Sequence, residues 1–340
     1  MTHRGPTHQK CSFQNSFFAP MGVYMKSTSL VLALGLLFSG APFVQAQNAP
    51  ATDAVATAIP GVIAAGSRIE LIEDDFEGTE GPIAHPDGGL LFTDNQASRI
   101  IKIEPDGRTS VFLEDTKEAN GLAFDPMGRL IAVQRAPGFA RIAVIYPDGE
   151  ETVLADQIDG RPFDRPNDLV LDKKGGVYFT DPNPQSVYYA SPTGSVIRVA
   201  DNINRPNGIL LSRDERTLYV NDSAGEYLLA YDVQPDGTVR NRSNFARYVG
   251  VSRTSDGITS GADGLAVDSE GRVYTTSNAG VDVFSPEGQH LGTIPVGIPG
   301  GRNPQNIAFA GHDKKTLYIV GRGAAFKVQM LAQGYMGRVK

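Results

Sequence analysis

The stretch RPNDLVLDKKGGVYFTD, residues 165–181, decides the fold. Val and Leu form a first apolar segment, Lys-Lys-Gly-Gly turns the chain, and Val-Tyr-Phe-Thr forms a second segment rich in strand-forming residues. An amide and a carboxylate, Asn167 and Asp168, stand directly ahead of the first strand. Their role depends on whether the stretch is unique or is one copy of a repeat.

The same pattern occurs six times along the chain. The copies begin at Glu80, Asn120, Asn167, Asn207, Asp263 and Gln305. Successive copies start 40, 47, 40, 56 and 42 residues apart. A period of roughly 40–50 residues with about four strands is typical of a β-propeller blade. We therefore predict an all-β fold, a six-bladed β-propeller with four-stranded antiparallel blades; the regular spacing disfavours an open sandwich of the same strands.

Three segments lie outside these copies. The strand-like SRIELI, residues 67–72, is predicted to pair with the C-terminal strand near FKVQM, residues 326–330, and so close the ring. Residues 238–262 are rich in Ser, Arg and Gly and are expected to form a long loop over one mouth of the propeller. Residues 47–66 are expected to be a linker, which places the propeller domain at residues 67–340.

The first 46 residues differ in composition from the rest. Met25-Lys26, the apolar run from Leu30 to Phe38 and the small residues around Ala46 have the pattern of a secretory signal peptide. The apolar run is too short for a membrane span. We expect residues 1–46 to be a leader that is cleaved near Ala46, and the mature protein to be periplasmic or secreted.

Charge and cysteine content restrict the partners. The leader contains three basic residues and no acidic one, so its removal leaves 28 basic and 38 acidic residues, a net charge of −10. An acidic chain of this kind is a poor ligand for nucleic acid or an anionic membrane. The only cysteine, Cys11, leaves with the leader, which excludes disulfides and thiolate metal sites in the mature protein.

The register of the copies predicts a polar ring. The first strand of each blade lines the central channel of a propeller, so the residue ahead of that strand recurs around the axis. In all six copies this residue carries a side-chain oxygen, and two of the six are carboxylates. Oxygen donors suit a hard cation such as Ca²⁺, Mg²⁺ or Mn²⁺. Zinc bound by His is disfavoured, because the three histidines outside the leader lack paired metal-ligand spacing.

A simpler interpretation exists for each position taken singly. Asn, Asp and Gly ahead of a strand are common turn formers. For Asn120 and Gln305 this interpretation is retained. It is weaker for Glu80, because Glu is a poor turn residue and Gly81-Pro82 fixes the backbone behind it.

Four motifs resemble those of the gluconolactonase and regucalcin (senescence marker protein) family. They are Glu80-Gly81-Pro82, Arg165-Pro166-Asn167-Asp168, Pro206-Asn207-Gly208 and Ala262-Asp263-Gly264. Each motif alone is weak, but all four occur in order, and the similarity extends from about Glu80 into the sixth copy. The resemblance implies a six-bladed propeller with one divalent cation at the channel mouth. Ca²⁺ is the first choice for this cation, with Mg²⁺, Mn²⁺ or Zn²⁺ as alternatives.

The resemblance also implies roles for individual residues. Glu80, Asn207 and Asp263 match the family's metal ligands. Asp263 also matches its proposed proton donor and acceptor, and Asp168 matches a second Asp implicated in some bacterial lactonases. Asp263 and Asp168 are therefore the candidate catalytic residues.

The candidate substrate-binding residues are Arg165, Asn167 and Asn120. Arg165 and Asn167 match the family's substrate contacts, and Asn120 holds the equivalent position in the second copy. An ion pair of Arg165 with Asp164 or Asp168 is an equally good interpretation of that charge.

The expected activity is metal-assisted hydrolysis of a lactone, such as gluconolactone, to the hydroxy acid. No G-x-S-x-G motif, no Cys outside the leader and no well-placed His offers another nucleophile or base. Two alternatives stay open. One is an aryl-ester or organophosphate hydrolase on the same scaffold, and the other is a non-catalytic binding propeller with a structural cation. We expect a monomer or a weak homo-oligomer that binds a small-molecule lactone, without nucleic-acid or membrane partners.

Overall fold

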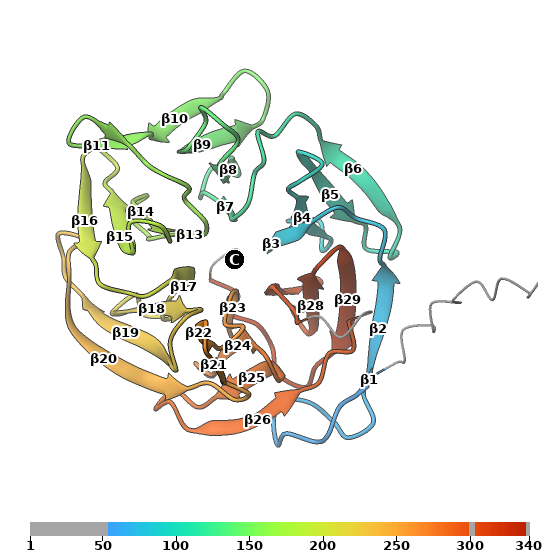
Figure 1. Cartoon of the computed structure of the whole chain (residues 1–340). Helices are drawn as coiled ribbons and strands as arrows, with labels where there is room; N and C mark the ends of the chain where they lie inside the picture. The colour runs from blue at the N-terminus through green and yellow to red at the C-terminus, as the bar shows by residue number, and fades with distance from the viewer. Residues whose placement is uncertain (1–53, 299–302, 338–340) are drawn as a thin grey trace, which may run out of the picture. The chain divides into compact units, whose positions relative to one another are not determined.

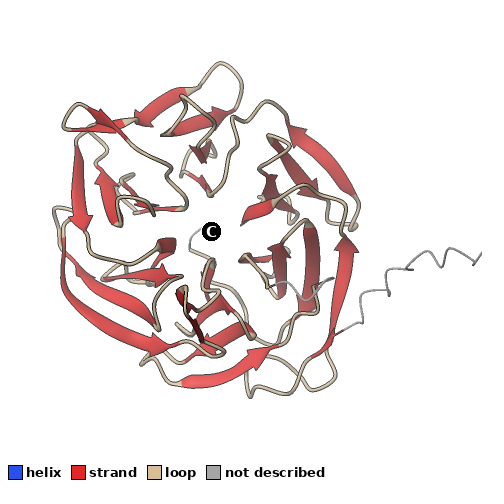
Figure 2. Cartoon of the chain, in the orientation of Figure 1, coloured by secondary structure: helices blue, strands red, loops and turns tan. Residues whose placement is uncertain are grey.

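A computed structural model describes residues 54–298 and 303–337. The predicted leader, residues 1–46, lies outside these ranges. The described chain contains strands, turns and loops without a helix, as Figure 2 shows. A search of the same residues found no helix of the length and apolarity that a membrane span requires.

Six antiparallel sheets follow one another around a ring (Figure 1). The first three are β3 (Thr79–Ala84), β4 (Leu90–Asp94), β5 (Arg99–Ile103) and β6 (Thr109–Leu113); β7 (Leu122–Phe124), β8 (Leu130–Gln134), β9 (Arg141–Tyr146) and β10 (Thr152–Ala155); and β13 (Leu169–Leu171), β14 (Val177–Asp181), β15 (Ser186–Ala190) and β16 (Val196–Ala200).

The last three blades complete the ring. They are β17 (Pro206–Leu211), β18 (Thr217–Asp222), β19 (Tyr227–Val233) and β20 (Val239–Arg247); β23 (Leu265–Val267), β24 (Val273–Ser277), β25 (Gly280–Phe284) and β26 (His290–Ile294); and β27 (Asn306–Ala310), β28 (Thr316–Gly321), β29 (Ala324–Gln329), β2 (Arg68–Glu73) and β1 (Ala54–Val55). The predicted six-bladed propeller is confirmed. In Figure 1 the first strands β3, β7, β13, β17 and β23 lie nearest the centre of the ring.

The sixth sheet contains strands from both ends of the described chain. β2 is antiparallel to β29, with Glu70 opposite Lys327 and Leu71 opposite Phe326. Residues 54–66 are the described part of the segment that we expected to be a linker, and some of their apolar side chains pack against the blades. Ile59 and Val62 are buried in a cluster with residues of β28 and β29. The apolar residues of this segment are isolated and lack strand periodicity, so this packing was not predicted from the pattern.

The expected long loop over residues 238–262 was wrong for its first part. Residues Val239–Arg247 form β20, the outer strand of the fourth blade, which pairs with β19. Its exposed face explains the polar composition, because the outermost strand of a blade faces solvent. Two small hairpins complete the strand inventory. They are β11 (Gln157–Ile158) with β12 (Arg161–Pro162), and β21 (Ser252–Thr254) with β22 (Gly257–Thr259).

The hydrophobic core lies between neighbouring blades. Leu90 and Phe92 of β4 pack in one buried cluster with Tyr318 and Val320 of β28, which joins the first blade to the sixth. Phe92 also contacts Phe76 edge to face, with ring centroids 5.0 Å apart. Burial of apolar surface at these junctions stabilises the ring and holds the inner strands in register.

Replacing Phe92 by Ala is expected to lower the free energy of unfolding by about 3–5 kcal/mol, because the side chain is fully buried at a blade junction. Urea unfolding measures this change. Val111→Ala is the control: this residue is 46% exposed on β6, and its replacement should cost less than about 1 kcal/mol. Equal losses for the two variants would contradict the assignment of the core.

Candidate active site

The starts of the six first strands contact one another in a ring. The amide of Gly121 donates to the Asn167 carbonyl at 3.2 Å, and that of Gly264 donates to the Gln305 carbonyl at 2.7 Å. The Gln305 side chain then donates to Glu80 Oε1 at 3.1 Å, which joins the last copy to the first. The sequence copies therefore converge on the channel, as their register predicted.

Hydroxyl groups of the second strands hold these positions. Thr93 of β4 donates to the Asn120 carbonyl at 3.1 Å, and Thr180 of β14 donates to the Asn207 carbonyl at 2.6 Å. Thr276 of β24 in the fifth blade donates in the same way to the Gln305 carbonyl of the sixth, at 3.2 Å. These three second strands thus hold the backbone of the polar residue in the next blade. The repeated Thr near the end of the second strand was a sequence signal for this contact.

Glycine follows the polar residue where the blades approach most closely. A Cβ on Gly208 would lie 1.8 Å from the Asp263 carbonyl oxygen, and one on Gly81 would lie 1.9 Å from that of Asn120. Gly81 also has a φ of 50°, which a residue with a side chain rarely adopts. The glycines of the EGP and PNG motifs are therefore required by packing around the channel.

Glu80 is buried and hydrogen-bonded. Its Oε2 accepts from the Asn306 side chain at 3.1 Å and from the Gly81 amide at 3.3 Å. Burial raises the pKa of the Glu80 carboxyl, the neighbouring charge of Asp168 raises it further, and the Asn306 hydrogen bond and the charge of Arg135 act against them.

Asp263 lies in the same electrostatic environment. Loss of solvent holds the pKa of its carboxyl well above the ordinary range, and the negative charges of Glu80 and Asp168 add to the effect. No described residue donates a hydrogen bond to the Asp263 carboxylate. Three carboxyl groups from different blades therefore face one region of the channel, without enough positive charge to balance them.

The Asn207 amide is oriented by a neighbouring hydroxyl. The Ser223 hydroxyl donates to the Ala262 carbonyl at 2.6 Å, so its oxygen accepts from Asn207 Nδ2 at 3.1 Å. This arrangement leaves Asn207 Oδ1 buried and without a hydrogen-bond partner among the described residues. An unpaired buried carbonyl oxygen is costly unless it binds a donor or a cation.

Glu80, Asn207 and Asp263 therefore fit a cation. They offer oxygen donors only. Two are carboxyl groups whose pKa is raised by burial and further by neighbouring negative charge, and one is an amide oxygen without a partner among the described residues. Within the described ranges no group of three or more His, Cys, Asp or Glu side chains has the arrangement of a metal site. The candidate set differs from such a group because its third donor is an amide.

Asp168, the second candidate catalytic residue, is almost fully buried. Its carboxylate accepts from the amides of Leu169, at 2.8 Å, and Ile209, at 3.4 Å. A Cβ on Gly121 would lie 2.5 Å from its Oδ1. Asp168 thus joins three successive blades, and these contacts make it a structural anchor beside the ring.

The three candidate substrate-binding residues lie at different depths: Asn120 is buried, Asn167 is half-buried and Arg165 is exposed. The Arg165 side chain is 55% exposed and faces Glu118 at 3.5 Å, rather than Asp164 or Asp168. Asn120 is only 1% exposed, and both ends of its amide are used: Oδ1 accepts from Asn95, and Nδ2 donates to the Asn167 carbonyl. This bonding favours the structural interpretation of Asn120.

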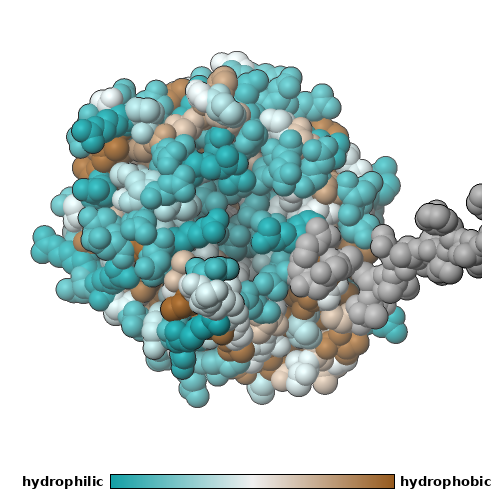
Figure 3. Space-filling view, viewed as in Figure 1, coloured by the Kyte–Doolittle hydropathy of each residue, from teal (hydrophilic) through white to brown (hydrophobic). Residues whose placement is uncertain are grey.

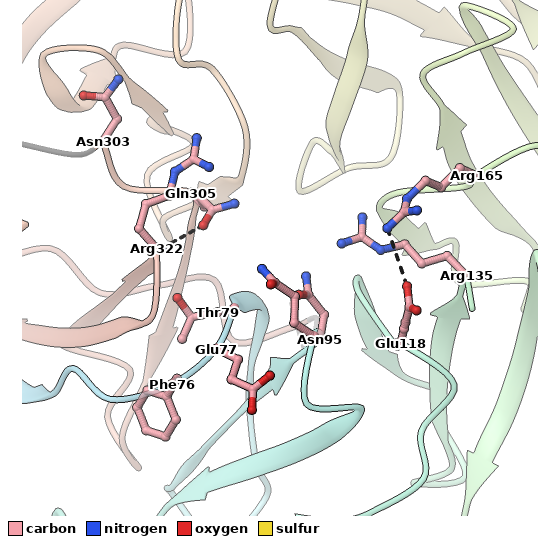
Figure 4. Close-up of a pocket in the computed structure, with 12 residues that line it drawn as sticks. Phe76, Glu77, Thr79, Asn95, Glu118, Arg135, Arg165, Asn303, Gln305 and Arg322 are labelled. Atoms are coloured by element: carbon pink, nitrogen blue, oxygen red, sulfur yellow. Dashed lines mark hydrogen bonds and ion pairs between the residues drawn. The ribbon is translucent and has the colours of Figure 1, made fainter. Parts of the chain in front are cut away.

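A cavity of about 730 Å³ lies at this mouth. It is lined by Phe76, Glu77, Gly78, Thr79, Asn95, Gln96, Glu118, Arg135, Arg165, Asn303, Gln305 and Arg322 (Figure 4). Gln305 connects the cavity to the ring through its bond to Glu80. The face of the ring seen in Figure 3 is largely hydrophilic toward its centre. Arg135 and Arg322 were not among the predicted site residues, because each directly follows the end of a repeat copy.

Raising the pH is expected to destabilise metal-free protein more in the wild type than in Asp263→Asn. Because the folded-state pKa of Asp263 lies above its ordinary 3.8, the folded protein keeps a proton that the unfolded chain has released. This stabilisation is complete below pH 3.8 and is lost as the pH rises through the folded-state pKa. Urea unfolding with chelator, from about pH 4 to pH 8, measures the difference. Parallel profiles for the two proteins would contradict the raised pKa.

The chain was compared with known proteins. Residues 78–322 match the model of the SMP-30/Gluconolactonase/LRE-like region. The chain belongs to this family. The match includes all four motifs and every candidate site residue.

Several family members are similar over most of their length. A gluconolactonase of Zymomonas mobilis is 29% identical over 296 residues, which cover 77% of this chain and 81% of the relative. A pentonolactonase of Haloferax volcanii is 26% identical, with 72% and 81% covered. The solved structure of a Xanthomonas campestris gluconolactonase is 28% identical with a TM-score of 0.69, and the alignment covers 82% of this chain and 94% of that one.

Proposed function

We propose that the protein is a metal-dependent lactonase that hydrolyses a sugar lactone to the hydroxy acid. Relatives named gluconolactonase and pentonolactonase support the reaction class. The observation that carries the proposal is the joint position of the Glu80 and Asp263 carboxyls and the unpaired Asn207 oxygen beside a polar cavity.

Glu80, Asn207 and Asp263 would hold the cation. Their all-oxygen set favours Ca²⁺, with Mg²⁺, Mn²⁺ or Zn²⁺ as alternatives. When bound, a divalent cation supplies Lewis acidity toward the lactone carbonyl. Ser223 keeps the Asn207 oxygen directed into the site, because it occupies the amide nitrogen.

Asp263 is the proposed general base. Its carboxylate takes a proton from the attacking water, whose oxygen forms a bond with the carbonyl carbon. The ring C–O bond then breaks, and the proton passes to the ring oxygen, which becomes a hydroxyl group of the product. A carboxylate that the other described residues leave free of hydrogen bonds suits this transfer, because its oxygen is available to the water. Asp168 is less suited, since backbone amides occupy its oxygens.

Arg165 and Asn167 are proposed to orient the substrate. Arg165 reaches the cavity from the loop ahead of β13. The backbone of this loop is held in place, because Asp181 accepts from the amides of Asp164 and Arg165 at 2.9 and 3.1 Å. The Arg165 guanidinium offers several hydrogen-bond donors to a lactone carbonyl or hydroxyl.

A substrate panel tests the function. Purified protein is assayed on gluconolactone, xylonolactone and a nitrophenyl ester, with chelator and after return of Ca²⁺, Mg²⁺, Mn²⁺ or Zn²⁺. We expect lactone hydrolysis that chelator abolishes and one of the cations restores. Hydrolysis of the nitrophenyl ester alone would favour an esterase. Cation binding without any hydrolysis would favour a binding propeller.

We also propose that the mature protein acts in the periplasm or outside the cell. The support is the composition of the leader, with Met25-Lys26 ahead of an apolar run and small residues near Ala46. The chain expressed in a Gram-negative host is expected to be recovered in the periplasmic fraction and to begin at Gln47. Intact mass spectrometry checks this start. Recovery of the uncleaved chain in the cytoplasm would reject the proposal.

A further inference from the structure

A second ring of residues surrounds the mouth of the channel. Each second strand ends at this face of the ring. The residues that directly follow the six second strands therefore occupy equivalent positions around the channel. These residues are Asn95, Arg135, Pro182, Ser223, Asn278 and Arg322. Since the second strands run antiparallel to the first, this ring lies beside the ring of candidate ligands.

The other polar members of this second ring are bonded within the protein. Asn95 donates to Asn120 at 2.8 Å, Ser223 donates to the Ala262 carbonyl, and Asn278 donates to the Thr259 carbonyl at 2.9 Å. Such bonds hold neighbouring loops together. These three residues therefore have structural tasks.

The two arginines differ from them. The Nε of Arg135 is buried and has no hydrogen-bond partner in the part of the chain that the structure describes. The backbone amide of Arg322 donates to Gln305, but no described residue forms a hydrogen bond or ion pair with its guanidinium. A buried guanidinium nitrogen without an acceptor, such as Arg135 Nε, is costly. Arg322 is exposed, so its guanidinium is open to a ligand, and an anion could bind both groups.

The cavity gathers positive charge around these two residues. Arg135 and Arg165 lie side by side in Figure 4, and Arg322 lies on the other side beside Gln305. The charge of Arg165 adds to burial in lowering the pKa of Arg135. The opposing charges in the lining are Glu118, which already faces Arg165 at 3.5 Å, and Glu77.

The carboxyls of the inner ring are the alternative partners of these arginines. The charge of Arg135 acts on Glu80 and Asp263, and that of Arg322 acts on Asp263. Within residues 54–298 and 303–337, however, no ion pair joins either arginine to these carboxyls. Long-range neutralisation of this kind does not use the hydrogen-bond donors of the two guanidinium groups.

We propose that Arg135 and Arg322 bind an acidic substituent of the substrate, so that the preferred substrate is a lactone carrying a carboxylate or phosphate besides its ring ester. The inference rests on the proposed lactonase function and narrows its substrate class. Both acidic groups offer at least two adjacent oxygens, which a guanidinium binds in a bidentate manner. The cavity of about 730 Å³ has room for a sugar-sized ring and such a substituent.

Three lactones with a similar sugar skeleton test the preference. They are glucono-δ-lactone, its ester with phosphate at the terminal carbon, and a glucarolactone with a carboxylate at that carbon. We expect kcat/KM for one acidic lactone to exceed that for the neutral one by about tenfold, a typical value for a charged hydrogen bond. The phosphate and carboxylate arms distinguish the two sources of the anion. Equal or better hydrolysis of the neutral lactone would overturn the proposal.

Variants of the two arginines test whether these residues cause the preference for an acidic lactone. Arg135→Gln and Arg322→Gln are expected to reduce the ratio of acidic to neutral kcat/KM by about tenfold each. Arg108→Gln is the matched control, because it removes the same charge from an exposed turn at the other end of the first blade. A ratio unchanged in both cavity variants would contradict the assignment.

Two further measurements keep the test decisive. If a variant fails to fold, added salt serves instead, since it should lower wild-type kcat/KM for the acidic lactone but not for the neutral one. If no lactone is hydrolysed, the proposed function fails, and calorimetry then decides the anion site alone. Glucarate or phosphogluconate should bind about tenfold more tightly than gluconate, and equal affinities would reject the site.

Discussion

Asp263→Asn is expected to lower kcat/KM for lactone hydrolysis by about 10²–10⁴-fold while the propeller stays folded. The change keeps the size of the side chain but removes the carboxylate that takes the proton from water. Steady-state kinetics measures the loss, and circular dichroism with urea unfolding checks the fold. The amide is accommodated in the metal-free protein, because the carboxyl it replaces already has a raised pKa.

Asp236→Asn is the matched control for this variant. Asp236 lies in the exposed turn between β19 and β20, where its carboxylate accepts from Thr238. The same chemical change there should leave hydrolysis as in the wild type. Full activity of correctly folded Asp263→Asn would exclude Asp263 as the base, and Asp168 would then be the remaining candidate.

Glu80→Gln is expected to weaken divalent cation binding by about 100-fold, because it removes one of the two carboxylates of the site. Isothermal titration calorimetry with Ca²⁺ and Mn²⁺ gives the affinities. The Gln305 and Asn306 side chains, which donate to Glu80, would then face a neutral amide. The loss of one negative charge and the loss of these hydrogen bonds both lower the affinity of the site for a divalent cation.

Two other variants separate a ligand effect from a general charge effect. Glu118→Gln removes the same charge from the cavity wall, where Glu118 faces Arg165, and should keep the cation affinity of the wild type. Ser223→Ala releases the Asn207 amide from its fixed orientation and should weaken binding by about tenfold. Equal losses for Glu80→Gln and Glu118→Gln would show that Glu80 is not a ligand.

The repeat made the fold and the inner ring predictable. Because all blades have the same register, the position of Asn167 in one copy indicated where Glu80 and Asp263 would lie in others. The structure shows these copies converging through contacts such as that between Gln305 and Glu80. The convergence of residues that are far apart in the sequence could thus be predicted from a local pattern.

Other parts of the site were not predicted from the motif. Asn120 has the register of a site residue, yet neighbouring amides occupy its side chain, which depends on Asn95 of another blade. Arg135 and Arg322 follow second strands, and the same register applied to strand ends would have identified them. The packing of Ile59 depends on tertiary contacts without any periodic signal.

Diffraction from crystals soaked in Mn²⁺ tests the central claim most directly. Anomalous scattering locates the ion independently of activity. We predict one strong peak in the channel, within about 2.6 Å of a side-chain oxygen of each of Glu80, Asn207 and Asp263. A fully occupied ion bound elsewhere, or these three oxygens turned toward different surroundings, would contradict the metal site and the mechanism that depends on it.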